Sequence, residues 1–211
     1  MKLAFIGIGQ VGAALAGNLA ALGHSVTIAA RDPSSKTVTE ALAKYPALAV
    51  AATEDAIAAA EVIFLATPFA AVSAALANGD AFAGKVLVDC TNPVGPGLTH
   101  GLDSKRSGSE AVQSLVPQAR VVKAFTIYGF ENFEDSAYPG YGDLKPAMLI
   151  AGDDAEAKQV VATLCQDLGW EPVDTGPLSM SLHLEHMTLL WIKMARVQGG
   201  GAGFVWARLQ R

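Results

Sequence analysis

A glycine pattern near the N-terminus, residues 7–12, limits the folds open to this chain more than any other feature. It follows a short apolar stretch at residues 2–6 and opens an Ala/Leu-rich stretch at residues 10–22 that ends at Gly23. Stretches of these lengths and compositions predict a buried strand and then a helix. A second strand predicted at residues 25–30 completes a βαβ unit of about 30 residues, the context that makes such a pattern informative.

Each glycine has a physical role if a dinucleotide pyrophosphate binds here. The first permits a tight turn after the strand, the second lets the backbone approach the phosphates, and the third lets the helix pack on the strand. The N-terminus of the helix then faces the phosphate charge with free N–H groups. We therefore predict a dinucleotide-binding turn formed by Gly7, Gly9, Gln10, Val11 and Gly12.

The end of the second strand predicts which dinucleotide binds. In NAD-selective folds of this kind an Asp or Glu here bonds the ribose 2′-hydroxyl, but this chain has Ala30 followed by Arg31. A guanidinium suits a 2′-phosphate, and Ser34, Ser35 and Lys36 add two hydroxyls and an ammonium to the same loop. These residues favour NADP(H) as the cofactor.

Asp32 is the neighbouring residue that would favour NAD if its carboxylate faced the ribose. It directly precedes Pro33, however, and this pair is typical of a helix start. We therefore expect Asp32 to act as the N-cap of the helix predicted at residues 36–44.

Strands and helices continue to alternate along the chain. Further strands are predicted at residues 48–51, 61–66, 85–89 and 120–125, with helices at 36–44, 54–60, 69–77 and 104–115. Two more units follow as a strand at 147–151, a helix at 154–168 and a strand at 171–174. The pattern predicts an α/β fold with a Rossmann-type doubly wound, mostly parallel sheet.

The C-terminal part is expected to be a small helical appendage. One amphipathic helix is predicted at residues 178–197, and a glycine run precedes the last residues. We expect residues 1–176 to form the NADP-binding domain and residues 177–211 the C-terminal helix and glycine-rich tail. Residues 128–142 are rich in aromatic residues and glycine and are too long for a simple connection, so they are a candidate substrate loop.

Composition excludes several classes of function. The chain has 15 Lys and Arg against 20 Asp and Glu, and a net charge of −5 argues against nucleic-acid or membrane binding. The most apolar stretch, residues 62–77, is shorter than the roughly 20 residues of a membrane helix and contains Pro68. Cys90 and Cys165 form no metal-binding pattern and are expected to be free thiols in the core. These features predict a soluble, cytoplasmic protein.

Polar residues and prolines follow two of the predicted strands. Thr67 and Pro68 follow one, and Asn92 follows another, at the strand ends where ligands bind in such sheets. Pro68 would form a wall beside the cofactor, and Asn92 would hold the carboxamide or a ribose hydroxyl. The alternative is that these residues only shape turns.

The histidines do not predict a metal site. His183 and His186 lie three residues apart on the C-terminal helix, but no nearby cluster supplies a third ligand. His24 lies in a predicted turn and His100 in a predicted loop, so both are expected to be solvated.

With these motifs the chain resembles the coenzyme F420-dependent NADP oxidoreductase family, and it is similar to the cytosolic oxidoreductase domain of membrane ferric reductases. Beyond the glycine turn, the resemblance rests on segments 30–33, 65–68, 91–93, 122–125, 152–155 and 174–178, with Glu185 and the glycine-rich C-terminus after them. It implies the same fold, NADP(H) as cofactor, and transfer of hydride to a deazaflavin or a flavin. The best candidates beside the nicotinamide are Asn92, Thr126 and Ile127, although family members commonly have Asn or His directly after the segment matching residues 123–125.

The short C-terminus limits the choice of hydride acceptor. Related dehydrogenases that oxidise hydroxy acids add a large helical domain, whereas only 34 residues follow Pro177 here. We therefore expect a small-molecule redox acceptor that is itself a planar cofactor, because the two cofactors then carry the reaction with little acid or base chemistry from the protein. A homodimer that shares a pocket through Met180, Met187 and Leu190 is one hypothesis. A non-catalytic NADP(H)-binding sensor or interaction module is the alternative function.

Overall fold

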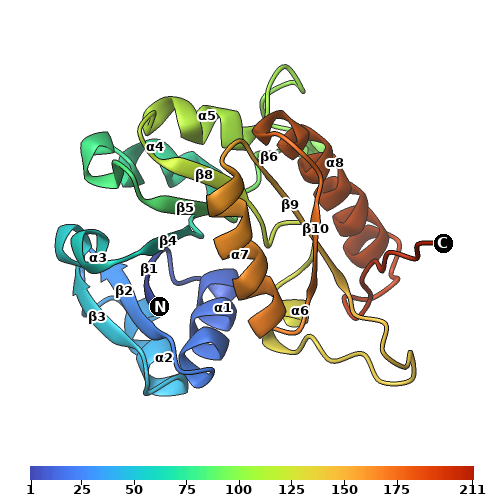
Figure 1. The fold of residues 1–211 in the computed structure, drawn as a ribbon, viewed down its shortest axis with the longest axis horizontal. Helices are drawn as coiled ribbons and strands as arrows, with labels where there is room; N and C mark the ends of the chain where they lie inside the picture. The colour runs from blue at the N-terminus through green and yellow to red at the C-terminus, as the bar shows by residue number, and fades with distance from the viewer.

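A computed structural model describes all of residues 1–211, and its centre is an eight-stranded sheet in the order β10-β9-β8-β5-β4-β1-β2-β3 (Figure 1). The strands are β1 (Lys2–Ile6), β2 (Ser25–Ala30), β3 (Ala49–Ala52), β4 (Val62–Leu65), β5 (Val86–Asp89), β8 (Arg120–Lys123), β9 (Ala147–Gly152) and β10 (Glu171–Asp174). Every neighbouring pair is parallel except β8 with β9. The strand order reverses at β1 and β4, so the predicted doubly wound, mostly parallel sheet is confirmed.

Helices cover both faces of this sheet. They are α1 (Gln10–Ala21), α2 (Lys36–Lys44), α3 (Thr53–Ala59), α4 (Val72–Ala75), α5 (Gly108–Leu115), α6 (Glu131–Glu134), α7 (Ala155–Asp167) and α8 (Ser181–Ile192). Buried residues of α1, α2, α7 and α8 share one apolar cluster with the sheet, and those of α3 and α5 share the other. None of the helices combines the length and the apolar character that crossing a membrane requires.

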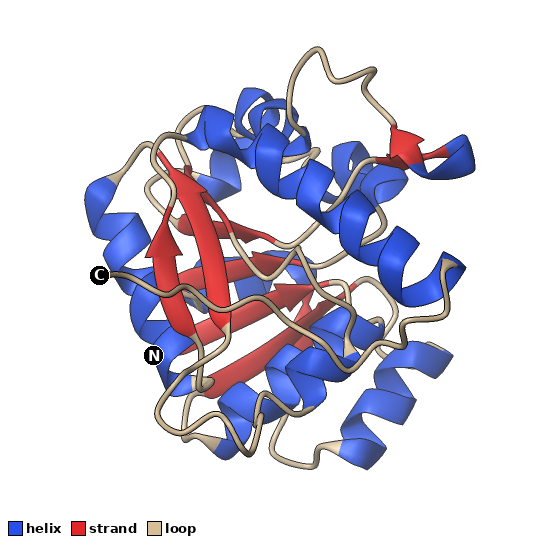
Figure 2. Cartoon of the chain, turned by 90° about the vertical axis from the view of Figure 1, so that its right-hand side faces the viewer, coloured by secondary structure: helices blue, strands red, loops and turns tan.

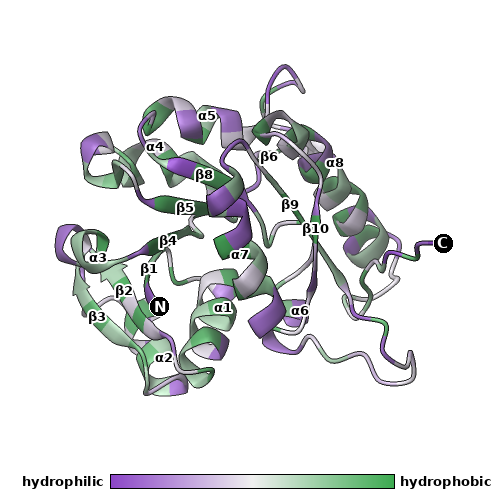
Figure 3. Ribbon diagram, in the orientation of Figure 1, coloured by the Kyte–Doolittle hydropathy of each residue, from purple (hydrophilic) through white to green (hydrophobic).

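The core forms because strand residues alternate between the two faces. Phe5 and Phe64 stand opposite each other on β1 and β4, and their rings stack at 4.4 Å on the α1 side. Their neighbours Ala4 and Ile63 point to the other face and are fully buried there. Figure 3 shows β4 and β5 as strongly hydrophobic, as expected of parallel strands covered on both faces.

Two predicted helices differ from the observed ones. The helix predicted at residues 69–77 is a 3-10 turn, Phe69–Ala71, followed by the single turn of α4. The helix predicted at 104–115 begins at Gly108, because Ser107 is its N-cap and forms a reciprocal capping box with Glu110. Ser104, the first residue of the predicted helix, and Asp103 before it instead have left-handed backbone angles.

A small hairpin outside the main sheet was not predicted (Figure 2). Strands β6 (Val94–Gly95) and β7 (Thr99–His100) pair antiparallel in the connection between β5 and α5. At the other end of the chain, the helix predicted at 178–197 consists of a 3-10 turn, α8 and one π-helical turn at Lys193–Val197. The tail then lies against β9, where the Ala147 N–H donates to the Trp206 carbonyl at 2.8 Å.

The segment 128–142 is not placed as a substrate loop over the glycine turn. Tyr128 and Phe133 are buried in the core, and the backbone around Phe133 accepts a hydrogen bond from Asn18 Nδ2 at 2.7 Å. Asn18 lies in the second half of α1, about 12 Å along the helix from its first residue. The segment therefore packs at the C-terminal end of α1, whereas the glycine turn lies at the N-terminal end.

Candidate functional site

A cleft of about 720 Å³ lies at the carboxyl ends of β1, β2 and β4. Gly7, Arg31, Ser35 and Thr67 line it on the polar side. Its other walls are mostly apolar and come from α3, α4 and the turn after α4, with Ile57, Ala75 and Phe82 among them. The cleft thus lies where the strand order reverses, the usual ligand position in a sheet of this type.

The glycine turn has the backbone that its pattern predicts. Gly7 has a φ of +95°, and a Cβ there would stand 2.6 Å from the Ala66 carbonyl oxygen. A Cβ on Gly12 would collide with the Gly7 carbonyl, so α1 passes directly over the end of β1. Gly9 is different, since no atom lies within 4 Å of the place where its Cβ would stand. The space above Gly9 and the uncapped N-terminus of α1 are therefore open to a phosphate.

The loop after β2 presents donors without partners. Arg31 is exposed and makes no hydrogen bond or ion pair. Ser35 is the N-cap of α2, yet its hydroxyl accepts no capping hydrogen bond. Lys36 is exposed and lies 3.7 Å from Glu40, one turn further along α2. A cation, a hydroxyl and an open helix N-terminus at one cleft suit a bound phosphate.

Asp32 is not the N-cap of α2, which corrects the expectation from its Asp-Pro pair. Ser35 holds that position, and the Asp32 carboxylate turns back within the loop. Asp32 Oδ1 accepts hydrogen bonds from the Ser34 hydroxyl at 2.6 Å and from the Ser34 backbone N–H at 2.9 Å. Ser34 does not line the cleft, so its hydroxyl is engaged away from the place expected for it.

The polar groups at the ends of β4 and β5 have different surroundings. Thr67 lines the cleft, and its hydroxyl oxygen is buried without any hydrogen-bond partner. Pro68 is exposed beside it but does not line the cleft. Asn92 is half-buried, and its amide donates to the Thr126 carbonyl at 3.3 Å and accepts from the Thr188 hydroxyl at 3.0 Å. Of the four buried side-chain atoms without a hydrogen-bond partner, the Thr67 hydroxyl oxygen is the one whose residue lines the cleft, where a ligand could satisfy it.

Thr126 and Ile127 do not reach the cleft. Strand β8 ends at Lys123, and Phe125 follows with a left-handed φ of +54° that is costly for a residue with a bulky side chain. The Phe125 ring packs between Phe64 and Phe133, and this turn carries Thr126 and Ile127 inward, where they are 3% and 1% exposed. The sequence expectation treated both as accessible because it continued the strand to Phe125.

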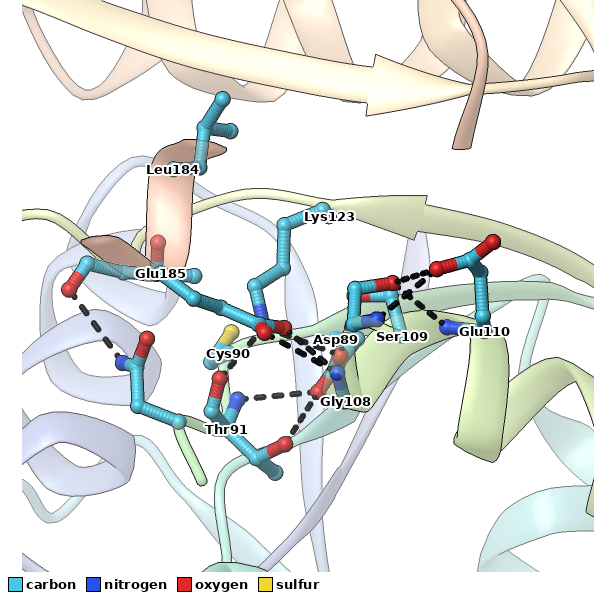
Figure 4. Close-up of polar contacts among 12 residues, drawn as sticks. Asp89, Cys90, Thr91, Gly108, Ser109, Glu110, Lys123, Leu184 and Glu185 are labelled. Atoms are coloured by element: carbon cyan, nitrogen blue, oxygen red, sulfur yellow. Dashed lines mark hydrogen bonds and ion pairs between the residues drawn. The ribbon is translucent and has the colours of Figure 1, made fainter. Parts of the chain in front are cut away.

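A buried polar cluster lies at the ends of β5 and β8 (Figure 4). Lys123 Nζ stands 3.2 Å from Asp89 Oδ2 and 3.1 Å from Glu185 Oε1, and all three side chains are at most 1% exposed. Both carboxylates also meet the N-terminus of α5, where the Gly108 N–H donates to Glu185 and the Ser109 hydroxyl donates to Asp89. The helix dipole and the lysine together stabilise the two negative charges.

Burial alone would lower the pKa of Lys123, but the facing carboxylates Asp89 and Glu185 outweigh it and hold the pKa above its ordinary value. The ammonium form of Lys123 is therefore favoured between the two carboxylates. Each polar atom of the lysine and the two carboxylates is accounted for by protein partners, including the Thr91 carbonyl and hydroxyl. The cluster joins α8 and α5 to the sheet and leaves no group free for a ligand.

His100 belongs to this cluster, so the expectation that it is solvated is wrong. Its ring is buried, and Nε2 lies 2.8 Å from Glu185 Oε2. Nδ1 accepts the backbone N–H groups of Leu102 and Ser104, which assigns the proton to Nε2. His24 is also mostly covered, 3.2 Å from Asp167. The β6–β7 hairpin brings His100 to α8. No local sequence signal predicted this hairpin.

The histidines of α8 serve different contacts. His186 Nε2 lies 3.1 Å from the Ser104 hydroxyl, and its ring stacks on His100 at 5.3 Å. His183 is exposed. No three His, Cys, Asp or Glu side chains are grouped so that they could hold a metal ion.

Comparison with known proteins gives one family. Residues 2–93 match the family model described as NADP oxidoreductase, coenzyme F420-dependent. A crystal structure of a protein provisionally assigned as an F420-dependent NADP reductase, from Arthrobacter sp. FB24, is 33% identical, with each chain fully covered and a TM-score of 0.89. The hypothetical protein SMa0349 from Sinorhizobium meliloti is 25% identical over the whole chain and 96% of its own, with a TM-score of 0.77.

The chain is also similar to a curated metalloreductase. Metalloreductase STEAP3 of Rattus norvegicus is 32% identical over 189 residues, which are 89% of this chain. Those residues are 36% of the metalloreductase, so the chain spans about a third of the length of the curated relatives that it matches. The expected similarity to both groups is confirmed.

Proposed function

Since the chain belongs to the coenzyme F420-dependent NADP oxidoreductase family, we propose that it transfers hydride between NADP(H) and a deazaflavin or flavin ring. Family membership makes it an NADP-dependent oxidoreductase, and the proposal concerns the second substrate. The observation that carries it is the cleft that joins the glycine turn to the unpaired Arg31.

The residues of the cleft fit NADP(H). We assign the pyrophosphate to the open space above Gly9, held by the backbone of the glycine turn, including Gln10 and Val11, at the N-terminus of α1. Arg31 and Ser35 would bind the 2′-phosphate, with Lys36 adding charge nearby. The orphaned hydroxyl of Thr67 would donate to the bound dinucleotide.

We assign the position of the nicotinamide from the order of the strands. We infer that the nicotinamide would lie beyond the cleft, along the ends of β4 and β5, where Pro68 and Asn92 lie. The Asn92 amide keeps one N–H free of protein acceptors, since only one hydrogen bond from Nδ2 is present. NADPH supplies the hydride, and this chain supplies position and exclusion of water. No two side chains of the cleft form an acid and base pair. Hydride transfer between two ring cofactors does not need such a pair.

The test is oxidation of NADPH, followed by its absorbance, with F420, FMN and FAD offered separately. We expect turnover with at least one of the three. Gly9→Asp is the matched inactive variant, because its Cβ enters open space, so the fold tolerates it, while its carboxylate repels the pyrophosphate. Absence of NADPH oxidation with every acceptor would remove the proposed reaction.

A non-catalytic NADP(H) sensor is the alternative, and one observation favours it. Thr126 and Ile127, the residues after β8 that were expected beside the nicotinamide, are buried, so neither offers an accessible side chain there. A sensor would bind NADPH tightly, with the affinity lost in Gly9→Asp, and would show no turnover with any acceptor.

Two further expectations belong to this proposal. The reaction takes place in a reducing compartment such as the cytoplasm, because Cys90 and Cys165 are free thiols in the core, as predicted. A homodimer would use the outer face of α8, where Leu190 is 49% exposed while Met180 and Met187 already pack partly on the core. Gel filtration of the wild-type chain and of Leu190→Glu tests this, and a monomer in both removes the dimer.

A further inference from the structure

The cleft wall after β2 carries opposite charges side by side. Arg31 and Asp32 are neighbours in sequence, and both line the cleft. A cation at this place favours a 2′-phosphate, whereas a carboxylate favours a free 2′-hydroxyl and repels a phosphate. The preference of the site therefore depends on which of the two side chains a ligand meets.

The structure keeps the two charges apart. Arg31 makes no ion pair, although a carboxylate is next to it in the chain. Asp32 Oδ1 accepts the Ser34 hydroxyl at 2.6 Å and the Ser34 N–H at 2.9 Å, and Ser34 lies outside the cleft wall. One oxygen of the carboxylate is thus turned from the ligand space, and the guanidinium is left free.

The Ser34 hydrogen bonds also keep Asp32 charged. The hydroxyl, and after it the backbone N–H, hold the pKa of Asp32 below its ordinary value. A carboxylate released from Ser34 would lose these hydrogen bonds, but its ordinary pKa of 3.8 would still leave it ionised at neutral pH, so it would repel a phosphate in the cleft.

Resting on the proposed NADP(H) site, we propose that Ser34 is a specificity-determining residue: it holds Oδ1 of the Asp32 carboxylate within the loop, so that a ligand meets mainly Arg31 and Ser35 and the site selects a 2′-phosphate over a 2′-hydroxyl. Ser34 is then a positioning residue that acts through Asp32. This differs from direct contact between Ser34 and the phosphate, the role that its place in the loop first predicts.

The two roles give different results in a double-mutant cycle. The variants are Ser34→Ala, Asp32→Asn and both together, and the readouts are dissociation constants for NADPH, NADH and 2′,5′-ADP. If Ser34 acts through Asp32, Ser34→Ala should lower NADPH and 2′,5′-ADP affinity about threefold to tenfold, because the released carboxylate would repel the phosphate at a solvent-exposed loop. NADH affinity should stay level or rise. In the Asp32→Asn background, where no charge is released, the same change should have no effect.

Two controls keep the result specific. Ser34→Thr retains the hydroxyl and should keep the wild-type preference. Ser35→Ala removes a donor expected to face the phosphate, so it should weaken NADPH in both backgrounds without any gain for NADH. All three positions of this loop that are changed are exposed or half-buried, so the variants are expected to fold.

If Ser34→Ala lowered NADPH affinity equally in the wild-type and Asp32→Asn backgrounds, the inference would be overturned. Ser34 would then be assigned to direct contact with the phosphate. An unchanged preference in Ser34→Ala would also overturn it. Both results require a wild-type chain that binds NADPH. A wild-type chain that binds neither dinucleotide would instead overturn the proposed function, and the inference would fail with it.

Discussion

The two polar regions of this protein differ in how fully their groups are paired. At the loop after β2, Arg31 has no partner and the Ser35 hydroxyl accepts no capping bond, although both line a cleft. At the ends of β5 and β8, Lys123, Asp89 and Glu185 are fully buried, and each is held by several protein groups. Polar groups that a fold leaves unpaired at a cleft indicate a ligand, whereas charges paired inside the core indicate a scaffold.

This difference predicts that changes in the first region alter binding with little effect on stability. Changes in the second region should alter stability first, and binding only as the fold fails. The expected effects range from complete loss of folding to a loss of affinity for one cofactor.

The largest effect should follow removal of residues 177–211. Glu185 of α8 is one of the two carboxylates that face Lys123, and Leu184 and Trp191 are 2% exposed in the main core cluster. Without them, Lys123 and the His100 hairpin lose a buried partner. We expect residues 1–176 alone to show no cooperative unfolding by circular dichroism in urea. A cooperative transition would instead support the separation into a domain and an appendage at residue 176.

Breaking the buried ion cluster should cost less than losing α8, but still most of the stability. Lys123→Met keeps the approximate length of the side chain and leaves two buried carboxylates without their cation. We expect the free energy of unfolding to fall by about 3–5 kcal/mol, measured by urea denaturation. Lys44→Met is the control, because the exposed pair of Lys44 and Glu134 at 2.6 Å should contribute less than about 1 kcal/mol. Similar losses of stability in the two variants would contradict the expected difference between the buried cluster and the exposed ion pair.

The buried thiols should make the core sensitive to alkaline pH. Burial raises the pKa of Cys90 and Cys165 above the ordinary value of 9.0, so both stay protonated in the fold. The unfolded chain loses these protons above pH 9, so stability is fully present below that pH and falls as the pH rises. At pH 10 the loss should be about 1.4 kcal/mol for each thiol. Urea denaturation of a chain with Cys90→Ala and Cys165→Ala should show a flatter dependence between pH 8 and 10, and an unchanged slope would assign the loss to other groups.

Most of the sheet could be predicted from the sequence because its signals are local. The glycine turn, the short apolar runs and the periodic helices each occupy a few consecutive residues, and their order determines a doubly wound sheet. The Ala30 and Arg31 pair was informative for the same reason. The direction of the Ser34 hydroxyl could not be predicted, because it depends on the conformation of the five-residue loop between β2 and α2.

The buried cluster could not be predicted because it depends on contacts between distant parts of the chain. Lys123 meets Asp89, 34 residues earlier, and His100 meets Glu185, 85 residues later. Each residue alone resembles a polar strand end or an exposed helix position. A signal was nevertheless present, since Asp89 and Lys123 both follow runs of buried apolar residues in adjacent strands. A charged residue there needs a partner of opposite charge.

The smallest change with a specific readout is Arg31→Ala. The guanidinium is exposed and unpaired, so its removal should leave the free energy of unfolding within about 0.5 kcal/mol of the wild type. NADPH should bind more weakly by about 1.5–3 kcal/mol, the contribution of hydrogen bonds to a charged group, while NADH should be almost unaffected. Arg106→Ala is the control, because Arg106 is also exposed but does not line the cleft. Equal losses of affinity for NADPH and NADH would show that Arg31 contacts a part that the two cofactors share. The proposal that its guanidinium selects the 2′-phosphate would then be wrong.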